Sequence, residues 1–180
     1  MLPSSSQTSD PIIRAAMPAD ALDIARIYNW YVDNTPITFE EQPVSEAAMG
    51  QRLGTAQHPW IVLEQGGRVL GFAYAGTFRS RSAYRYSVET TIYLDREAQG
   101  KGLGTRLYEA LIDRLRATPA HLLIAIIALP NDRSVGLHEK LGFEKAGHLQ
   151  QVGRKFDRWI DVGHWQLLLG SENADQSKAG

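Results

Sequence analysis

A short glycine-rich stretch, QGKGLGT at residues 99–105, lies between a strand-like and a helix-like segment and suggests anion binding. The dinucleotide fingerprint G-x-G-x-x-G does not fit, because counting from Gly100 and Gly102 places Thr105 where the third glycine belongs. A P-loop is excluded as well, since Lys101 is followed by Gly102 rather than by Ser or Thr. Glycines before a helix still let backbone N–H groups converge on an anion, and the helix N-terminus adds its positive dipole end. The stretch is therefore a candidate pyrophosphate site, with a flexible glycine turn as the alternative.

The composition excludes several other kinds of chemistry. The chain has no cysteine, which rules out disulfides, thiol nucleophiles and cysteine metal sites. Lys and Arg total 19 against 20 Asp and Glu, a net charge of -1, so neither a nucleic-acid surface nor a membrane-binding patch is indicated. No metal is expected, because four histidines without metal-ligand spacing are read as structural or exposed: His58, His121, His148 and His164. Small ligands, anionic ones included, remain.

Hydrophobic periodicity and turn residues predict the elements that position these residues. Residues 12–16 read as a short strand, a helix is expected from about Pro18, and a second helix follows the cap-like Ser45. Two strands are joined by Gly66 and Gly67, because paired glycines accept the positive φ values of a tight hairpin.

The second half of the chain continues the alternation of strands and helices. Residues 86–94, YSVETTIYL, form a strand, and leucines spaced by four mark a helix over about 102–116. The apolar run at 122–129 fits a strand buried on both faces. A short helix that stops at Gly142 and two further strands follow.

This order of elements argues for one mixed α/β (α+β) domain at residues 12–169. A flexible leader at 1–11 and a flexible tail at 170–180 are expected to flank it. The N-terminus lacks the basic and apolar segments of a secretory signal, and the longest apolar run is too short for a membrane helix. A cytoplasmic protein without a membrane partner is predicted.

Several segments resemble a known family in the right order. The strand, Q/R-x-x-G-x-G/A loop and helix are similar to the acetyl-CoA pyrophosphate loop of the GNAT N-acetyltransferases, and ALPNDRSVGLHEKLGF resembles that family's last strand and cofactor-side helix. IYNWYVDNTPITFEEQPVS, GTFRSRSAYRYSVETTIYL and VGRKFDRWIDVGHWQ resemble the branch of phosphinothricin and methionine sulfoximine/sulfone N-acetyltransferases. The similarity covers about residues 12 to 169 and implies the GNAT acyl-CoA N-acyltransferase fold, with about six or seven strands and about four helices around a mixed central sheet.

The resemblance also implies where acetyl-CoA would bind. The strand backbone at residues 92–94 would pair with the amides of the pantetheine arm, and residues 100–105 would hold the pyrophosphate. A helix N-cap is the alternative role of Ser134. The implied cofactor residues are Ile92, Tyr93, Leu94, Gln99, Gly100, Lys101, Gly102, Leu103, Gly104, Thr105, Asn131 and Ser134.

Acetyl transfer to an amine requires a neutral nitrogen, so a general base is expected. Glu89 is the only carboxylate in YSVETTIYL, on the strand whose next residues would line the cofactor. The alternative is that Glu89 only pairs with the substrate ammonium or a neighbouring Arg, and whether a base there acts directly or through water stays open. His138 stands where many GNAT enzymes carry a Tyr thought to protonate the departing thiolate, and imidazole can do that work. A capping or core histidine is the alternative.

The acceptor is expected to be the α-amine of a small amino-acid analogue, such as phosphinothricin, methionine sulfoximine or methionine sulfone. Guanidinium groups among aromatic residues in TFRSRSAYRYS suit a carboxylate or phosphinate. The predicted substrate residues are Arg79, Arg81, Ser82, Ala83, Tyr84 and Glu89, with Tyr28, Phe39 or Trp60 closing the pocket. Another amine, from a polyamine or a peptide N-terminus, and a non-catalytic acyl-CoA sensor are the alternatives. The resemblance further implies a homodimer, and Asp157 stands where relatives often have Gly.

Overall fold

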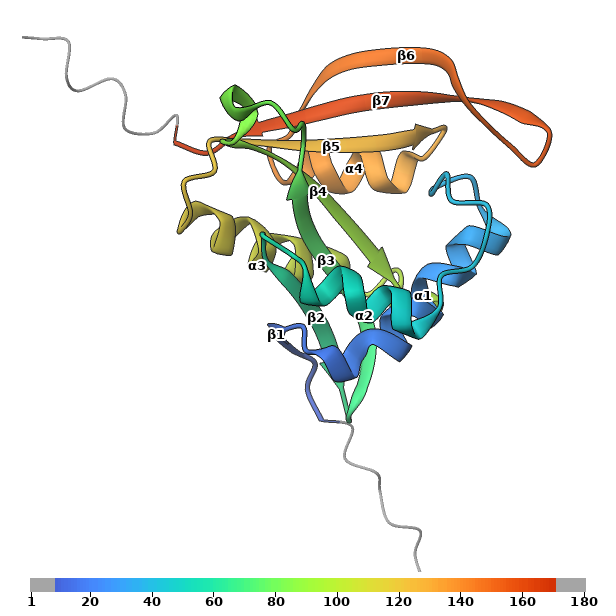
Figure 1. The fold of residues 1–180 in the computed structure, drawn as a ribbon, viewed down its shortest axis with the longest axis vertical. Coiled ribbons are helices and arrows are strands. Elements are labelled where there is room, and N and C mark those ends of the chain that lie inside the picture. The colour runs from blue at the N-terminus through green and yellow to red at the C-terminus, as the bar shows by residue number, and fades with distance from the viewer. Residues whose placement is uncertain (1–8, 171–180) are drawn as a thin grey trace, which may run out of the picture.

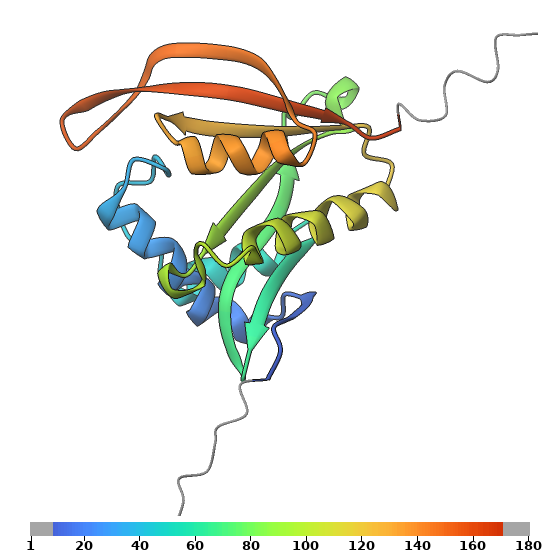
Figure 2. The same cartoon turned by 180° about the vertical axis from the view of Figure 1, so that it is seen from behind.

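The computed structural model describes residues 9–170, which form a seven-stranded sheet with helices on both faces (Figures 1 and 2). The strands are β1 (Ile12–Ala15), β2 (Trp60–Gln65), β3 (Arg68–Thr77), β4 (Ser87–Leu94), β5 (Leu122–Leu129), β6 (Glu144–Lys155) and β7 (Arg158–Leu168). The helices are α1 (Ala21–Asn34), α2 (Glu46–Gly54), α3 (Leu103–Arg116) and α4 (Asp132–Lys140), with short 3-10 turns η1 (Pro18–Asp20), η2 (Ser82–Tyr84) and η3 (Arg96–Ala98). This mixed architecture confirms the predicted fold class. Residues 1–8 and 171–180, most of the predicted leader and tail, lie outside the described part of the chain.

The sheet is split between its two central strands. In the order β1-β2-β3-β4-β5-β7-β6, β4 and β5 are parallel and pair only from Ser87 to Glu89 on β4. Beyond Glu89 the two strands diverge, as both views of the ribbon show (Figures 1 and 2). The edge of β4 that faced β5 therefore has no partner strand along its last residues. The sheet consists of a β1–β4 half and a β5–β7–β6 half that are joined at one end.

Each face of the β1–β4 half packs against its own helices. Helices α1 and α2 cover the face that carries Phe72 and Tyr93, and α3 covers the opposite face (Figures 1 and 2). The predicted leucine stripe of α3 is confirmed, because Leu107, Leu111 and Leu115 are completely buried. Burying each such side chain contributes roughly 1.5–3 kcal/mol. The stripe therefore anchors α3, and with it the glycine loop that precedes the helix.

Local signals explain several element ends. Ser45 caps α2, since its hydroxyl accepts a hydrogen bond from the Ala48 N–H at 3.2 Å. Gly66 and Gly67 join β2 to β3 with φ values of 60° and 80°, as predicted. Asp157 lies in the β6–β7 turn with a φ of 57°, a conformation that favours glycine.

One expectation about β5 is wrong. The strand is not buried on both faces throughout, because Ile126 is 41% exposed. The core formed by α1 and α2 includes residues of β2, β3 and β4 but none of β5. One face of the β5–β7–β6 half is therefore left open over Ile126.

A buried polar network connects three elements behind the split. The Tyr108 hydroxyl on α3 lies 2.6 Å from Thr90 Oγ1 on β4 and 3.1 Å from His138 Nε2 on α4. His138 Nδ1 lies 2.7 Å from the Ser134 carbonyl oxygen, which can only accept, so Nδ1 carries the ring proton. Burial lowers the pKa of His138, so the ring is neutral near pH 7 and Nε2 accepts from Tyr108. The network joins α3 of one half to α4 of the other.

Removing the Tyr108 hydroxyl should destabilise the fold. The substitution Tyr108→Phe leaves Thr90 and His138 without their shared partner, and a buried unsatisfied group costs about 1–3 kcal/mol. Urea unfolding should show the free energy of unfolding falling by about that amount. Tyr86→Phe, at an exposed side chain, is the matched control and should unfold like the original protein. Equal stability of all three proteins would show that these bonds contribute nothing.

Candidate active site

A cavity of about 570 Å³ lies between β4 and α4, where the sheet is split. Its wall is formed by Trp30, Tyr31, Thr35, Ile37, Ile92, Tyr93, Leu94, Gln99, Gly100, Gly102, Gly104, Thr105, Asn131, Arg133, Ser134, Gly136, Leu137 and Lys140. Every predicted cofactor residue lines this cavity except Lys101 and Leu103. The split thus brings together the strand, the glycine loop and the helix that the sequence singled out.

The glycine loop reaches the cavity in a conformation that favours glycine. Gly100 and Gly102 have φ values of 76° and 74°, a region that side chains rarely adopt. Gly102 is also the N-cap of α3 and provides no side-chain cap, so the first N–H groups of this 14-residue helix are left for a ligand or solvent. Gly104 is small for a different reason, because a Cβ there would lie 3.1 Å from Leu94 Cδ1. The loop offers backbone donors and a helix dipole to an anion.

The free edge of β4 forms a second wall. The Asp95 N–H donates to the Leu70 carbonyl of β3, so alternation along the strand points the backbone groups of Ile92 and Leu94 toward the other edge. The Tyr31 hydroxyl donates to the Leu94 carbonyl oxygen at 2.6 Å, which agrees with that orientation. An extended ligand with its own amides can pair with such an edge as an added strand does.

The side chain of Gln99 spans the cavity between two helices. Its amide nitrogen donates to the Tyr31 hydroxyl of α1 at 3.0 Å, and its carbonyl oxygen accepts from the Arg133 guanidinium of α4. Sequence reasoning did not identify Arg133, although Arg133, Gly136, Leu137 and Lys140 follow helical spacing and line the cavity together. The residues of α1 and the segment after it carried no comparable signal.

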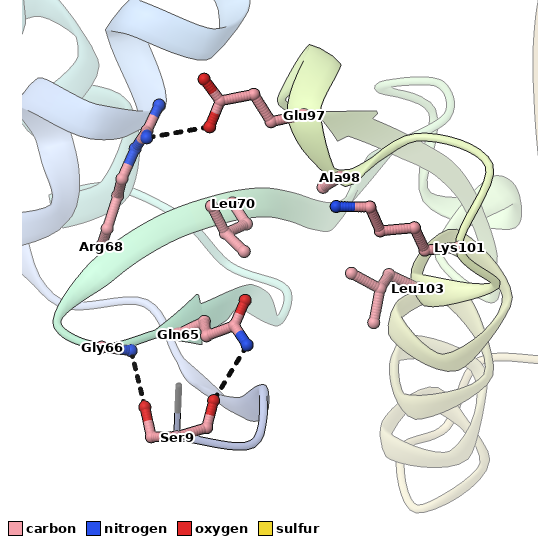
Figure 3. A pocket seen from close by; sticks show the side chains of 9 residues that line it. All are labelled: Ser9, Gln65, Gly66, Arg68, Leu70, Glu97, Ala98, Lys101 and Leu103. Carbon is pink, nitrogen blue, oxygen red and sulfur yellow. Dashed lines mark hydrogen bonds and ion pairs between the residues drawn. The ribbon is translucent and has the colours of Figure 1, made fainter. Parts of the chain in front are cut away.

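Lys101 and Leu103 face away from this cavity. They line a second cavity of about 400 Å³ between the loop and the β2–β3 hairpin, where Figure 3 shows the Lys101 side chain extending from the loop toward β3. The chain turns at Gly100 and Gly102 on either side of Lys101, which directs that side chain to the other side of the loop. Leu103 packs in the hydrophobic core beneath α3. The positions of the Lys101 and Leu103 side chains therefore do not support the predicted role of these residues in the cofactor site.

Asn131, rather than Ser134, caps α4. The Asn131 side-chain oxygen accepts from the Ser134 N–H at 3.2 Å, so the N-cap role considered for Ser134 belongs to Asn131. Both residues line the cavity. The amide nitrogen of Asn131 remains to donate to a ligand.

Glu89 lies where the pairing of β4 with β5 ends. It lies on the same face of β4 as Tyr93. Along the strand it precedes Ile92 by three residues, at a rise of roughly 3.3 Å per residue. Within the described residues its carboxylate has no hydrogen-bond or ion-pair partner, and burial raises its pKa. Its partner on β3 is Gly76, where an added Cβ would meet nothing within 4 Å. The carboxylate thus has the raised pKa and the free space that a base needs, although it does not line the 570 Å³ cavity.

His138 lies in the core and not on the cavity wall. It is 3% exposed, packs edge-on against Tyr108 and Phe143, and has both ring nitrogens in the network described above. Reaching a thiolate would require the ring to leave one of these partners. The geometry therefore argues against the predicted general acid and fits the alternative of a core histidine.

The predicted substrate residues lie on the segment between β3 and β4. Arg79, Arg81, Ser82, Ala83 and Tyr84 are exposed there and do not line the main cavity. Within the described residues, neither arginine has a carboxylate partner. Their role toward a substrate stays a prediction.

The three aromatic residues expected to close the pocket have different positions. Tyr28 is a buried residue of α1, and Trp60 stacks on Tyr74 with ring centroids 4.0 Å apart. Phe39 is 43% exposed on the segment between α1 and α2. Only Phe39 is therefore placed on a loop near the cavity.

Neither a metal site nor a membrane helix is found among residues 9–170. No group of three or more His, Cys, Asp or Glu side chains in this range can hold a metal ion. No helix in the same range is long and apolar enough to cross a membrane.

Comparison with known proteins assigns the family. The model of the acetyltransferase (GNAT) family matches residues 24–143. A phosphinothricin N-acetyltransferase of Streptomyces viridochromogenes is 39% identical over 156 residues, 86% of this chain and 85% of the relative. An L-methionine sulfoximine/L-methionine sulfone acetyltransferase of Pseudomonas paraeruginosa is 40% identical over 161 residues, 87% of this chain and 94% of the relative.

A solved structure agrees with these relatives. The crystal structure of a GNAT superfamily phosphinothricin acetyltransferase from Sinorhizobium meliloti in complex with AcCoA matches with a TM-score of 0.87 and 39% identity. The match covers 96% of this chain and 95% of the other. The chain therefore belongs to the GNAT family of acetyltransferases.

Proposed function

We propose that the protein transfers the acetyl group of acetyl-CoA to the α-amine of a small amino-acid analogue, such as phosphinothricin, methionine sulfoximine or methionine sulfone. The observation that carries this proposal is the meeting of an unpaired strand edge, a glycine turn and a helix N-terminus in one cavity. The names of the relatives support the donor and the class of acceptor.

The residues of the cavity fit acetyl-CoA. The backbone at Gly100, Gly102 and the first turn of α3 would hold the pyrophosphate, and the two glycines, favoured by their positive φ values, place no side chain in its way. The edge groups of Ile92 and Leu94 would pair with the amides of the pantetheine arm. When bound, acetyl-CoA supplies the acetyl group as a reactive thioester.

Glu89 would deprotonate the acceptor. Model α-amino groups titrate at roughly 7.7 to 8.0, so most acceptor arrives as an ammonium ion without a lone pair. Burial raises the pKa of Glu89, which strengthens it as a base, and the space at Gly76 admits the amine or a bridging water. The neutral amine then attacks the thioester carbonyl, and the departing thiolate takes its proton from solvent rather than from the buried His138.

The acceptor's acidic group would meet arginine. Arg79 and Arg81 are exposed on the segment before β4, the strand that carries Glu89. A guanidinium binds a carboxylate or phosphinate through paired hydrogen bonds. The cytoplasm, as predicted from the sequence, is the proposed location of the reaction.

A homodimer is part of the proposal. The β5–β7–β6 half exposes six large apolar side chains, whereas monomers rarely expose large apolar patches. They are Ile126, Leu149, Val152, Phe156, Trp159 and Leu168, each more than 40% exposed. Ile126 lies on the face that α1 and α2 leave open. A second copy of the chain would cover this face, on which the strand register also places Leu149 and Leu168.

A thiol-release assay tests the proposed reaction. The protein should release coenzyme A from acetyl-CoA when phosphinothricin, methionine sulfoximine or methionine sulfone is added. Glu89→Gln should lower turnover about 10²-fold or more and alter the acidic limb of the pH profile, because a positioned base contributes about 10² to 10⁴-fold. With Glu89 acting as the base, turnover of the original protein should fall as the pH drops through its raised pKa.

The control for the base is Glu144→Gln, an exposed carboxylate on β6 that should leave turnover unchanged. Unchanged turnover in Glu89→Gln would remove Glu89 as the base. Thiol release only with polyamines or peptides would replace the acceptor class, and no release with any amine would favour an acyl-CoA sensor.

The glycine loop is tested by Gly102→Val. A side chain at a φ of 74° strains the loop at the start of α3, so the Kd for acetyl-CoA should rise at least tenfold, by about 1.4 kcal/mol or more. Calorimetry measures it. Gly67→Val places the same strain at a φ of 80° in the β2–β3 turn, outside both cavities, and should leave the Kd unchanged. Normal affinity in Gly102→Val would contradict the loop assignment.

Sedimentation velocity tests the dimer. The original protein should sediment as a dimer, and Leu149→Glu should shift it to the monomer by placing a charge in the interface. Leu22→Glu is the control, because Leu22 is 61% exposed on α1, in the other half of the sheet. A monomeric original protein at micromolar concentration would refute this part of the proposal.

A further inference from the structure

The segment between α1 and α2, residues 35–45, crosses the open end of the split sheet. At its start, Thr35 and Ile37 line the main cavity. Farther along, it reaches the end of β6, which belongs to the other half of the sheet (Figure 1). We call residues 35–45 the crossing loop.

Lys155 makes the main polar contact between the crossing loop and β6. Its ammonium group donates to the Thr38 carbonyl oxygen at 2.8 Å, across 117 positions of sequence. The residue is only 4% exposed, although it ends a strand next to a surface turn. A buried lysine is uncommon unless its charge is satisfied, and the hydrogen bond to Thr38 provides that partner.

Nearby carboxylates partly offset the cost of burying the charge of Lys155. Burial lowers its pKa, and the carboxylates of Asp33, Glu40 and Glu41 oppose that effect. A hydrogen bond from a charged donor is roughly twice as strong as a neutral one. The contact therefore holds the loop more firmly than a neutral side chain would.

A second contact two residues earlier on β6 is apolar. The Phe39 ring lies on the backbone of Gly153, so closely that a Cβ at residue 153 would stand 2.2 Å from Phe39 Cε2. Only glycine leaves room for the ring there. Lys155 and Gly153 thus hold adjacent residues of the crossing loop, Thr38 and Phe39.

The other contacts of the crossing loop stay within the first half of the molecule. The Thr38 hydroxyl lies 2.7 Å from the Tyr28 hydroxyl of α1, and the Asn29 side chain bonds both backbone groups of Val44. Glu40 pairs with Arg52 of α2 at 2.8 Å. Among the hydrogen bonds and ion pairs of the described residues, that of Lys155 is the one that ties the loop to β6, and the Phe39 ring adds an apolar contact at Gly153.

The crossing loop lies on the acceptor side of the cavity. It joins α1 and α2, which cover the face of β4 that carries Tyr93 and Glu89. The glycine loop instead leads into α3 on the opposite face. A displaced crossing loop would therefore alter the wall next to the acceptor and leave the anion site intact.

We propose that Lys155 is a positioning residue for the acceptor amine, which holds the crossing loop against β6 and so fixes Thr38 and Phe39 on the side of the sheet that carries Glu89. This inference rests on the proposed acetyl transfer, because the acceptor is defined by it. Gly153 positions the same loop through an apolar contact, because the Phe39 ring packs on its backbone.

Kinetics of Lys155→Met test the inference. The KM for the acceptor should rise about tenfold while kcat stays within about threefold, as expected when a binding contribution common to ground and transition states is lost. The Kd for acetyl-CoA by calorimetry should not change. Lys145→Met is the matched control, because Lys145 lies exposed at the other end of β6 and should leave all three constants unchanged.

A second variant keeps the test independent of the lysine. Gly153→Ala should raise the acceptor KM in the original background by displacing Phe39, but should add nothing in a Phe39→Ala background, where no ring is left to displace. Additive effects of the two substitutions would show that Gly153 does not act through the Phe39 ring.

Amide hydrogen exchange separates this inference from the proposed function. Amides of residues 37–42 should exchange faster in Lys155→Met than in the original protein, whether or not an acceptor is turned over. Unchanged exchange together with an unchanged acceptor KM would overturn the role of Lys155. Failure of the original protein to acetylate any amine would instead overturn the proposed function, while the exchange result still reports on the loop.

Discussion

The site depends on one constraint in the sheet, the short pairing of β4 with β5. Three residue pairs hold the two strands together, and the strands diverge after Glu89. An unpaired strand edge is normally a hazard, since it invites pairing with another chain. Here the edge is enclosed by α4, the glycine loop and the end of α1, which leaves a cavity with backbone donors and acceptors on one wall.

A split sheet needs bridges to keep its halves at a fixed distance. On the α3 side, Tyr108 connects Thr90 with His138 through buried hydrogen bonds. On the other side, Lys155 reaches Thr38 of the crossing loop. Both bridges are polar contacts with little exposure to water, so each is stronger than it would be on the surface. The polar residues of the core therefore support the shape of the cavity.

The two faces of the split serve different parts of the proposed reaction. The N-terminus of α3 offers donors for an anion without requiring a basic patch, which agrees with the net charge of -1. The other face presents a carboxylate whose pKa is raised by burial, opposite a glycine that leaves space. The anion of the donor would thus bind beyond the end of β4, and the acceptor would approach where the pairing of β4 with β5 ends.

The sequence was sufficient to predict the order of elements and most of the cavity wall, because periodicity and glycine turns are local signals. It did not predict that Lys101 points behind the loop, because the direction of a side chain between two glycines depends on their φ values. Burial of His138 and exposure of Ile126 depend on which helix covers which half, a tertiary property. Arg133 was missed because its partner, Gln99, lies 34 positions away in the chain.

The central claim is that the free edge of β4 binds the acetyl donor, and amide exchange followed by NMR tests it most directly. Adding acetyl-CoA should slow exchange at the N–H groups of Ile92 and Leu94, which have no partner strand, and should leave the Ile12–Ala15 edge strand unaffected. Saturating acetyl-CoA without any slowing at these two amides would contradict the account.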